Sequence, residues 1–310
     1  MTLRNITPAQ LSEKLQQVLL GRKEVCDQIV IALIAGGHVL LEDVPGTGKT
    51  TVAKGLATLL RASFERIQCT PDLLPQDMTG ATLYDRQDGR LVFQKGPLFA
   101  HVVLVDELNR ATPRSQSALL EAMAERQITA DGKTHPLPAP YFVMATQNPV
   151  EHEGTFPLPE AQLDRFLMRL SIGYASKEVE ASLLLGYQIP PLEYQTDKEI
   201  VLQWQDDVKK VRLDEDLAYY IVELADKSRK HPDIALGVSP RASLAMAQAA
   251  RAKALLMGRD YVVPDDIISL LDVVWSHRLL LTGDAELKEQ STHAVLAQIR
   301  QNTPTPVEVP

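Results

Sequence analysis

The sequence predicts an α/β fold: a parallel sheet with helices on both faces and inserted β-hairpins, followed by a smaller α-helical part. Up to about residue 174, short apolar runs typical of strands alternate with segments of helical periodicity, a pattern that favours a parallel sheet. Beyond that point only helical periodicity remains. A glycine-rich turn also joins a strand to a helix at 43–50, which is typical of α/β proteins that bind phosphate groups.

Apolar spacing predicts each element of the α/β part in turn. Five strands are expected at 39–42, 64–68, 102–105, 141–146 and 167–172. Four helices are expected at 8–20, 22–35, 49–60 and 114–126. Two hairpins should interrupt the alternation, one over 80–96 and one over 127–140 that turns at Asp131-Gly132.

The change of pattern near residue 174 predicts the domain organisation. We expect an α/β nucleotide-binding domain at 1–174, a helical lid domain at 175–302 and a disordered tail at 303–310. Helices of the second domain are expected at 178–185, 200–208, 215–227, 241–256 and 265–280.

Composition narrows the class of protein. Hydrophobic residues make up 45% and charged residues 23% of the chain, and the net charge is −8, which indicates a globular protein and makes a nucleic-acid partner unlikely on charge grounds. No apolar run is long enough for a membrane span. The first residues carry no signal-peptide pattern, so a cytoplasmic location is expected. Neither the two cysteines nor the histidines have metal-ligand spacing.

The stretch from Leu40 to Thr50 predicts a pocket for a nucleoside triphosphate. Backbone N–H groups of the turn can face the phosphates, Lys49 can reach the β- and γ-phosphates, and Thr50 can ligate Mg²⁺. One position departs from the usual pattern, because Asp43 stands where a glycine is expected. An ordinary glycine-containing turn is the alternative. The residues expected to surround the phosphates are Pro45, Gly46, Thr47, Gly48, Lys49, Thr50 and Thr51.

A second signature follows at Val102 to Glu107. Four apolar residues predict a central strand, and the acids fall at its carboxyl end, where ligands of open α/β sheets bind. We expect Asp106 to hold Mg²⁺ indirectly, either through water or together with Thr50, and Glu107 to polarise the attacking water. Adjacent strand residues should point to opposite sides. Many buried strands end in an acid, so this signature gains its weight from the turn at 43–50.

Three further polar residues are candidates for the same chemistry. Asn148, at the end of the next strand, could orient the water or contact the γ-phosphate, although an Asx-turn before Pro149 is the alternative. Arg165 and Arg241 could neutralise charge on the transferred phosphoryl group, with surface ion pairs as the alternative.

The chain resembles the AAA+ ATPases, and among them the MoxR family. The resemblance extends from about Leu11 to Leu280. It is carried by the runs Leu40–Thr50, Val103–Arg110, Ala145–Pro149 and Glu151–Phe166, of which the last is the most specific to the family.

The resemblance implies a role for each matched residue. It assigns Lys49 and Thr50 to the Walker A motif, Asp106 and Glu107 to Walker B, and Asn148 to sensor 1. Arg165 matches the arginine finger, which acts on the nucleotide of a neighbouring subunit, and Arg241 matches sensor 2 in the lid. Gly21 and Arg22 fall in the region near the adenine. The two hairpins match the helix-2 insert and the pre-sensor-1 hairpin.

The resemblance also implies a function. It points to Mg²⁺-dependent ATP hydrolysis in a homo-oligomeric, hexameric ring. The ring would act as a chaperone-like remodeller in complex maturation or metal-cofactor insertion, with partners that carry a von Willebrand factor A domain. A nucleic-acid-stimulated motor and an ATP-binding scaffold with little turnover are the alternatives. Tyr84 and Phe93 of the first hairpin either grip a polypeptide or pack under the hairpin. The sequence does not name the client protein.

Overall fold

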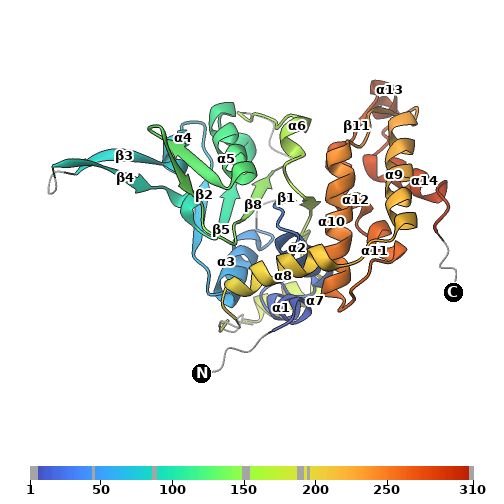
Figure 1. The fold of residues 1–310 in the computed structure, drawn as a ribbon, viewed down its shortest axis with the longest axis horizontal. Helices are drawn as coiled ribbons and strands as arrows, with labels where there is room; N and C mark the ends of the chain where they lie inside the picture. The colour runs from blue at the N-terminus through green and yellow to red at the C-terminus, as the bar shows by residue number, and fades with distance from the viewer. Residues whose placement is uncertain are drawn as a thin grey trace.

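The computed structural model describes residues 6–43, 46–85, 89–148, 154–186, 192–193 and 196–306. Figure 1 shows the α/β part and the helical part side by side, with the long helices α8 (Glu199–Lys210) and α10 (Pro240–Leu256) between them. The expected α/β core with a following helical part is confirmed. Pro45, Pro149 and Glu151 to Glu153, which belong to the motifs quoted above, lie outside the described residues.

The central sheet has five strands in the order β2-β5-β8-β1-β9, and every neighbouring pair is parallel. The strands are β1 (Val39–Glu42), β2 (Phe64–Gln68), β5 (Val102–Asp106), β8 (Phe142–Gln147) and β9 (Met168–Leu170). The register sets Gln68 opposite Asp106, and Glu42 opposite Gln147. The polar ends of four strands therefore meet at one edge of the sheet, as parallel packing requires.

Each face of the sheet carries its own hydrophobic core. Leu41 of β1, Leu104 of β5 and Met144 of β8 pack with helices α1, α2 and α3, whereas Leu40 and Val105 pack with α5 on the other face. Neighbouring strand residues point to opposite faces, so a continuously apolar strand such as β5 supplies both cores. The helices are α1 (Pro8–Leu15), α2 (Lys23–Ile34), α3 (Lys49–Leu59) and α5 (Pro113–Glu125).

Both predicted hairpins are present. Strands β3 (Gly80–Asp85) and β4 (Arg90–Lys95) form a ribbon that projects from the body, as Figure 1 shows. Strands β6 (Gln127–Ala130) and β7 (Lys133–Pro136) turn at Asp131-Gly132, where both residues have positive φ angles of 49° and 73°, as a type I′ turn requires.

An aromatic stack connects the two hairpins. The Phe93 ring lies on His135 with ring centroids 4.1 Å apart, and it also meets the Phe99 ring edge-on at 5.9 Å. Phe93 therefore packs under its hairpin. Tyr84, the other aromatic residue considered for gripping a polypeptide, leaves 63% of its surface exposed.

The helical part contains elements that periodicity did not predict. The prediction of a single helix at 265–280 is wrong. The chain instead forms α11 (Pro264–Ile268), α12 (Leu271–Trp275) and a 3₁₀ turn at Ser276–Arg278. The break follows tertiary contacts: Trp275 Nε1 donates to Ala242 O at 3.0 Å, and Arg278 Nη2 donates to Phe166 O at 2.8 Å. The helices expected at 178–185, 200–208 and 215–227 are present as α7 (Lys177–Leu184), α8 and α9 (Glu215–Lys230).

Further differences concern short elements and the chain ends. The first helix ends at Leu15 and not at residue 20. Thr303, expected at the start of a disordered tail, is buried, and its hydroxyl donates to Ile299 O at 2.7 Å. Within the ranges that the structure describes, the unpredicted elements are α4 (Pro75–Thr79), α6 (Glu160–Leu163), β10 (Ile234–Leu236), β11 (Leu280–Leu281), α13 (Gly283–Leu287), α14 (Thr292–Gln301) and two 3₁₀ turns, at Pro97–Phe99 and Leu108–Arg110. Among the described residues, no helix is both long enough and apolar enough to cross a bilayer.

Candidate nucleotide site

A cavity of about 350 Å³ lies at the carboxyl edge of the sheet, over the start of α3. Gly46 and Gly48 have φ angles of 86° and 94°, a conformation in which glycine avoids the Cβ clash that other residues meet. Lys49 begins α3, and its Nζ donates to the backbone oxygen of Asp43 at 2.9 Å. The cavity is lined by Gly46, Gly48, Lys49, Thr50, Thr51, Arg66, Gln68, Asp106, Glu107, Thr146 and Asn148.

Asp106, the last residue of β5, and Glu107, which follows it, line this same cavity. We expected their side chains to point to opposite sides, and that expectation is wrong. Glu107 leaves the strand with φ 56° and ψ 48°, a left-handed conformation that is uncommon for residues other than glycine and often marks a functional site. Its N–H donates to Thr146 Oγ1 at 2.9 Å, and the Thr146 hydroxyl donates to Asp106 Oδ1 at 3.3 Å.

Polar residues that sequence reasoning missed hold both acids. Arg66 Nε lies 2.6 Å from Asp106 Oδ2, and Arg66 Nη2 donates to Gln68 Oε1 at 3.0 Å. Gln68 Nε2 and Arg110 Nη1 both donate to Glu107 Oε2, at 2.9 and 3.1 Å. The sequence did carry a signal for Arg66 and Gln68, because they alternate along a strand whose end should reach the site.

Asp43, the departure from the glycine pattern, has a structural role. Only 5% of it is exposed. Its carboxylate accepts hydrogen bonds from the Ser171 hydroxyl at 2.9 Å and from the N–H groups of Ile172 and Gly173 at 2.6 and 2.9 Å. The side chain therefore attaches the start of the glycine-rich turn to the segment that follows β9.

A second cavity of about 360 Å³ lies on the other side of the glycine-rich turn and shares Gly46, Gly48 and Thr51 with the first. Arg22 lines it. Gly21 adjoins this wall, since a Cβ built there would lie 3.7 Å from a methyl group of Val179. The other residues that line the second cavity are Val18, Leu19, Leu20, Thr47, Ile172, Gly173, Tyr174, Ala175, Val179 and Glu180. An apolar wall beside the phosphate turn suits a flat base.

Asn148 lines the first cavity directly after β8, and 8% of it is exposed. Thr50 and Asp106 line the same cavity and offer a hydroxyl and a carboxylate oxygen, the ligand types that Mg²⁺ takes. This donor set fits the expected metal. In the described part of the chain, no cluster of three or more His, Cys, Asp or Glu residues could form a different metal site. Burial, with Asp106 and Glu107 nearby, raises the pKa of the Cys69 thiol to about 12, so that thiol stays protonated.

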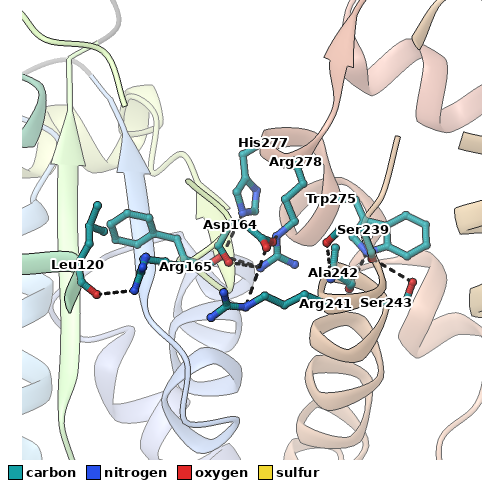
Figure 2. Close-up of polar contacts among 11 residues, drawn as sticks. Leu120, Asp164, Arg165, Ser239, Arg241, Ala242, Ser243, Trp275, His277 and Arg278 are labelled. Carbon is teal, nitrogen blue, oxygen red and sulfur yellow. Dashed lines mark hydrogen bonds and ion pairs between the residues drawn. The ribbon is translucent and has the colours of Figure 1, made fainter. Parts of the chain in front are cut away.

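The structure does not bring Arg165 and Arg241 to either cavity of their own chain. Figure 2 shows both near Asp164, between the α/β part and the helical part. Arg165 Nη1 donates to Leu120 O at 3.0 Å, and Arg241 Nε lies 4.0 Å from Asp164 Oδ2 with 64% of its side chain exposed. Arg241 stands in the first turn of α10, which Ser239 caps by accepting from the Ala242 N–H at 3.1 Å.

A third arginine, Arg278, takes the buried position beside Asp164. Its Nε lies 3.0 Å from Asp164 Oδ1, and only 4% of its side chain is exposed. Burial lowers the pKa of Arg278 to about 10, although Asp164 acts in the opposite direction. Arg278 therefore joins the helical part to the core, whereas Arg241 remains accessible.

Comparisons with known proteins agree with this geometry. Residues 38–168 match the model of the ATPase family associated with various cellular activities (AAA), and residues 226–299 match the AAA lid domain. The chain is 46% identical over 300 residues to the uncharacterised protein YeaC of Bacillus subtilis, covering 96% of this chain and 94% of YeaC.

Relatives that carry a family name are also similar to this chain over most of their length. The chain is 39% identical to the chaperone MoxR1 of Mycobacterium tuberculosis, over 94% of this chain and 81% of MoxR1. It is 30% identical to the protein MoxR of Methylorubrum extorquens, over 96% of this chain and 95% of MoxR. A crystal structure of a Cytophaga hutchinsonii protein superposes with a TM-score of 0.89 at 36% identity, covering 96% of this chain and 94% of the other. The chain therefore belongs to the MoxR family of AAA+ ATPases.

Proposed function

We propose that the protein hydrolyses ATP with Mg²⁺ as a homo-oligomeric ring, and that it uses the reaction to remodel partner proteins. The observation that carries the proposal is the first cavity, in which Lys49, Thr50, Asp106, Glu107 and Asn148 line one space at the carboxyl edge of the sheet. A cation, two oxygen ligands, a base and a neutral amide are the set that phosphoryl transfer to water requires.

Each residue takes a part that its position supports. The turn at Gly46 to Gly48 presents backbone N–H groups at the start of α3, where the helix dipole also favours phosphate. Lys49 offsets negative charge on the β- and γ-phosphates. Glu107 accepts the proton of the attacking water, and Asn148 holds that water or a γ-phosphate oxygen. A Mg²⁺ ion bound by Thr50 and Asp106 would withdraw charge from the phosphate oxygens.

The position of the two arginines supports the proposal of a ring. Arg165 and Arg241 line neither cavity of their own chain, yet phosphoryl transfer in this class draws on arginines that neutralise the transition state. A neighbouring subunit can supply them when the exposed face around Asp164 meets its nucleotide. We propose a hexamer as the closed ring.

The family supports the proposal on partners. MoxR1 of Mycobacterium tuberculosis is named a chaperone, and we propose the same class of activity here, on partners with a von Willebrand factor A domain. Tyr84, exposed on the projecting hairpin, is available to contact a polypeptide.

Two variants test the hydrolysis. Lys49→Ala should lose binding of a fluorescent ATP analogue, with Lys54→Ala, on an exposed position of the same helix, as its matched control. Glu107→Gln should keep that binding and lower phosphate release by about 10²–10⁴-fold, while Glu121→Gln on the exposed side of α5 should change neither. Unchanged nucleotide affinity in Lys49→Ala would refute the assignment of the site.

A further inference from the structure

Asp106, which the proposed function gives to the metal, already has a cationic partner from another strand. Arg66 Nε lies 2.6 Å from Asp106 Oδ2. The exposed fractions of the two side chains differ, at 49% for Arg66 and 9% for Asp106. The acid is thus fixed inside the cavity, whereas the guanidinium reaches in from its rim and can leave toward solvent.

The position of Arg66 follows from the register of β2. Arg66 pairs with Leu104 and Gln68 with Asp106 across the β2–β5 ladder. Residues two apart on a strand point to the same face, so Arg66 and Gln68 lie side by side above the acids. Both line the first cavity.

Hydrogen bonds connect Arg66 to the second acid as well. Arg66 Nη2 donates to Gln68 Oε1 at 3.0 Å, and Gln68 Nε2 donates to Glu107 Oε2 at 2.9 Å. A charged donor orients the amide of Gln68, because that amide can offer its NH₂ group to Glu107 only while its oxygen faces Arg66. The contact at Asp106 therefore sets the contact at Glu107.

We propose that Arg66 is the resident counter-ion of Asp106, that it competes with the divalent metal for this carboxylate, and that its departure loosens the hold of Gln68 on Glu107. The inference rests on the proposed function, since it concerns metal loading of that same cavity. A guanidinium and a divalent cation repel each other at contact distance, so they cannot both sit against the same carboxylate oxygen. Binding of the metal at Asp106 and release of Glu107 from Gln68 are thus coupled through Arg66.

The test measures metal affinity, without turnover. Mg²⁺ is titrated into protein with bound fluorescent ADP, and the apparent Mg²⁺ dissociation constant is compared between variants. Arg66→Gln should bind Mg²⁺ about tenfold or more tightly, because removing a competing charge acts on this scale. Arg66→Lys keeps the positive charge but loses the second N–H donor to Gln68. Its Mg²⁺ affinity should therefore lie between those of the unaltered protein and Arg66→Gln.

Two controls separate competition from general effects. Arg212→Gln removes an arginine that pairs with Asp214 at 3.0 Å in the helical part, and it should leave the Mg²⁺ constant unchanged within about twofold. Gln68→Ala should raise Mg²⁺ affinity less than Arg66→Gln does, since Gln68 does not touch Asp106. Because about half of the Arg66 side chain is exposed, circular dichroism should show each variant folded.

Other results decide against the proposal. An unchanged or weaker Mg²⁺ affinity in Arg66→Gln would overturn it. A loss of metal-free ADP binding by about tenfold or more would instead make Arg66 a phosphate ligand and would also overturn it. If the unaltered protein binds no ADP at all, the proposed function itself fails, and this inference fails with it.

Discussion

The carboxylate of Asp43 accepts a hydrogen bond from the backbone N–H of Ile172 at 2.6 Å, which connects the turn after β1 to the segment after β9. β1 leads into the glycine-rich turn that both cavities share, the segment after β9 lines the second cavity, and β9 is an edge strand of the sheet. The same carboxylate also satisfies the N–H of Gly173. A glycine at position 43 would leave these donors without their acceptor. An aspartate at this position therefore serves to attach the segment after the edge strand β9 to the glycine-rich turn.

Asp43→Gly should therefore destabilise the fold, although it restores the residue that a typical phosphate turn carries. Buried donors left unpaired cost about 1–3 kcal/mol each, and we expect a loss of about 2–4 kcal/mol in the free energy of unfolding. Urea denaturation followed by circular dichroism measures it. Asp43→Asn keeps one acceptor oxygen and should lose less. Equal stability of Asp43→Gly and the unaltered protein would contradict this account.

Stability should also fall with acid because of His38. Burial lowers the pKa of His38 to about 4. The neutral ring accepts the Val143 N–H at Nδ1, 3.1 Å away, and Nε2 lies 3.3 Å from Met123 O. A histidine with a depressed folded pKa favours folding above its unfolded pKa of about 6.5, and this contribution declines as the pH falls from there toward the folded pKa.

The titration of His38 alone should lower the free energy of unfolding by about 2 kcal/mol between about pH 7.5 and pH 5. Urea denaturation at several pH values measures it. His38→Asn, which keeps an acceptor near the Val143 N–H but does not titrate, should show a shallower decline over this range. A variant with the same pH slope as the unaltered protein would show that His38 does not cause the decline.

The two aromatic residues of the projecting hairpin should respond differently to removal. Phe93→Ala abolishes the stack on His135 and the edge-on contact with Phe99, each worth about 0.5–1.5 kcal/mol. Amides of β3 and β4 should then exchange with deuterium about tenfold faster. Tyr84→Ala removes an exposed ring and should leave exchange in the hairpin unchanged. Equal effects of the two variants would contradict the division into a packing and an accessible residue.

Much of the fold could be predicted because its strands carry a strong signal. β5 is apolar over four residues and ends in acids, so both its burial and its orientation follow from the pattern. The helix expected at 265–280 failed for the opposite reason. Its apolar spacing is regular, but contacts of Trp275 and Arg278 with distant backbone oxygens decide the local conformation.

The lining of the first cavity was predicted to the extent that its chemistry is local in sequence. Lys49, Asp106 and Asn148 were expected together from the strand ends and the glycine-rich turn, and all three line that cavity. Arg66 and Gln68 were missed because polar residues in a strand are usually solvated, and only the register with β5 brings them over the acids. Arg165 and Arg241 line neither cavity of their own chain, so the contact with a nucleotide that we propose for them needs a second subunit, which one chain's sequence does not describe.

The last prediction tests that second subunit. Arg165→Ala should lower ATP turnover by about 10³–10⁵-fold, and Lys49→Ala should abolish it. In a mixture of the two, a subunit with intact Lys49 can receive Arg165 from its Lys49→Ala neighbour. Phosphate release should therefore recover to a fraction of the unaltered rate, set by how often such neighbours meet.

The matched control carries both changes on one chain. A mixture of Lys49→Ala with the Lys49→Ala, Arg165→Ala double variant contains no intact Lys49 and should stay inactive. The same design applies to Arg241, whose exposed side chain near Asp164 gives it the same access to a neighbour. If the Arg165 mixture shows no recovery while subunits exchange freely, Arg165 does not act across the interface, because subunit exchange alone would have produced complete sites.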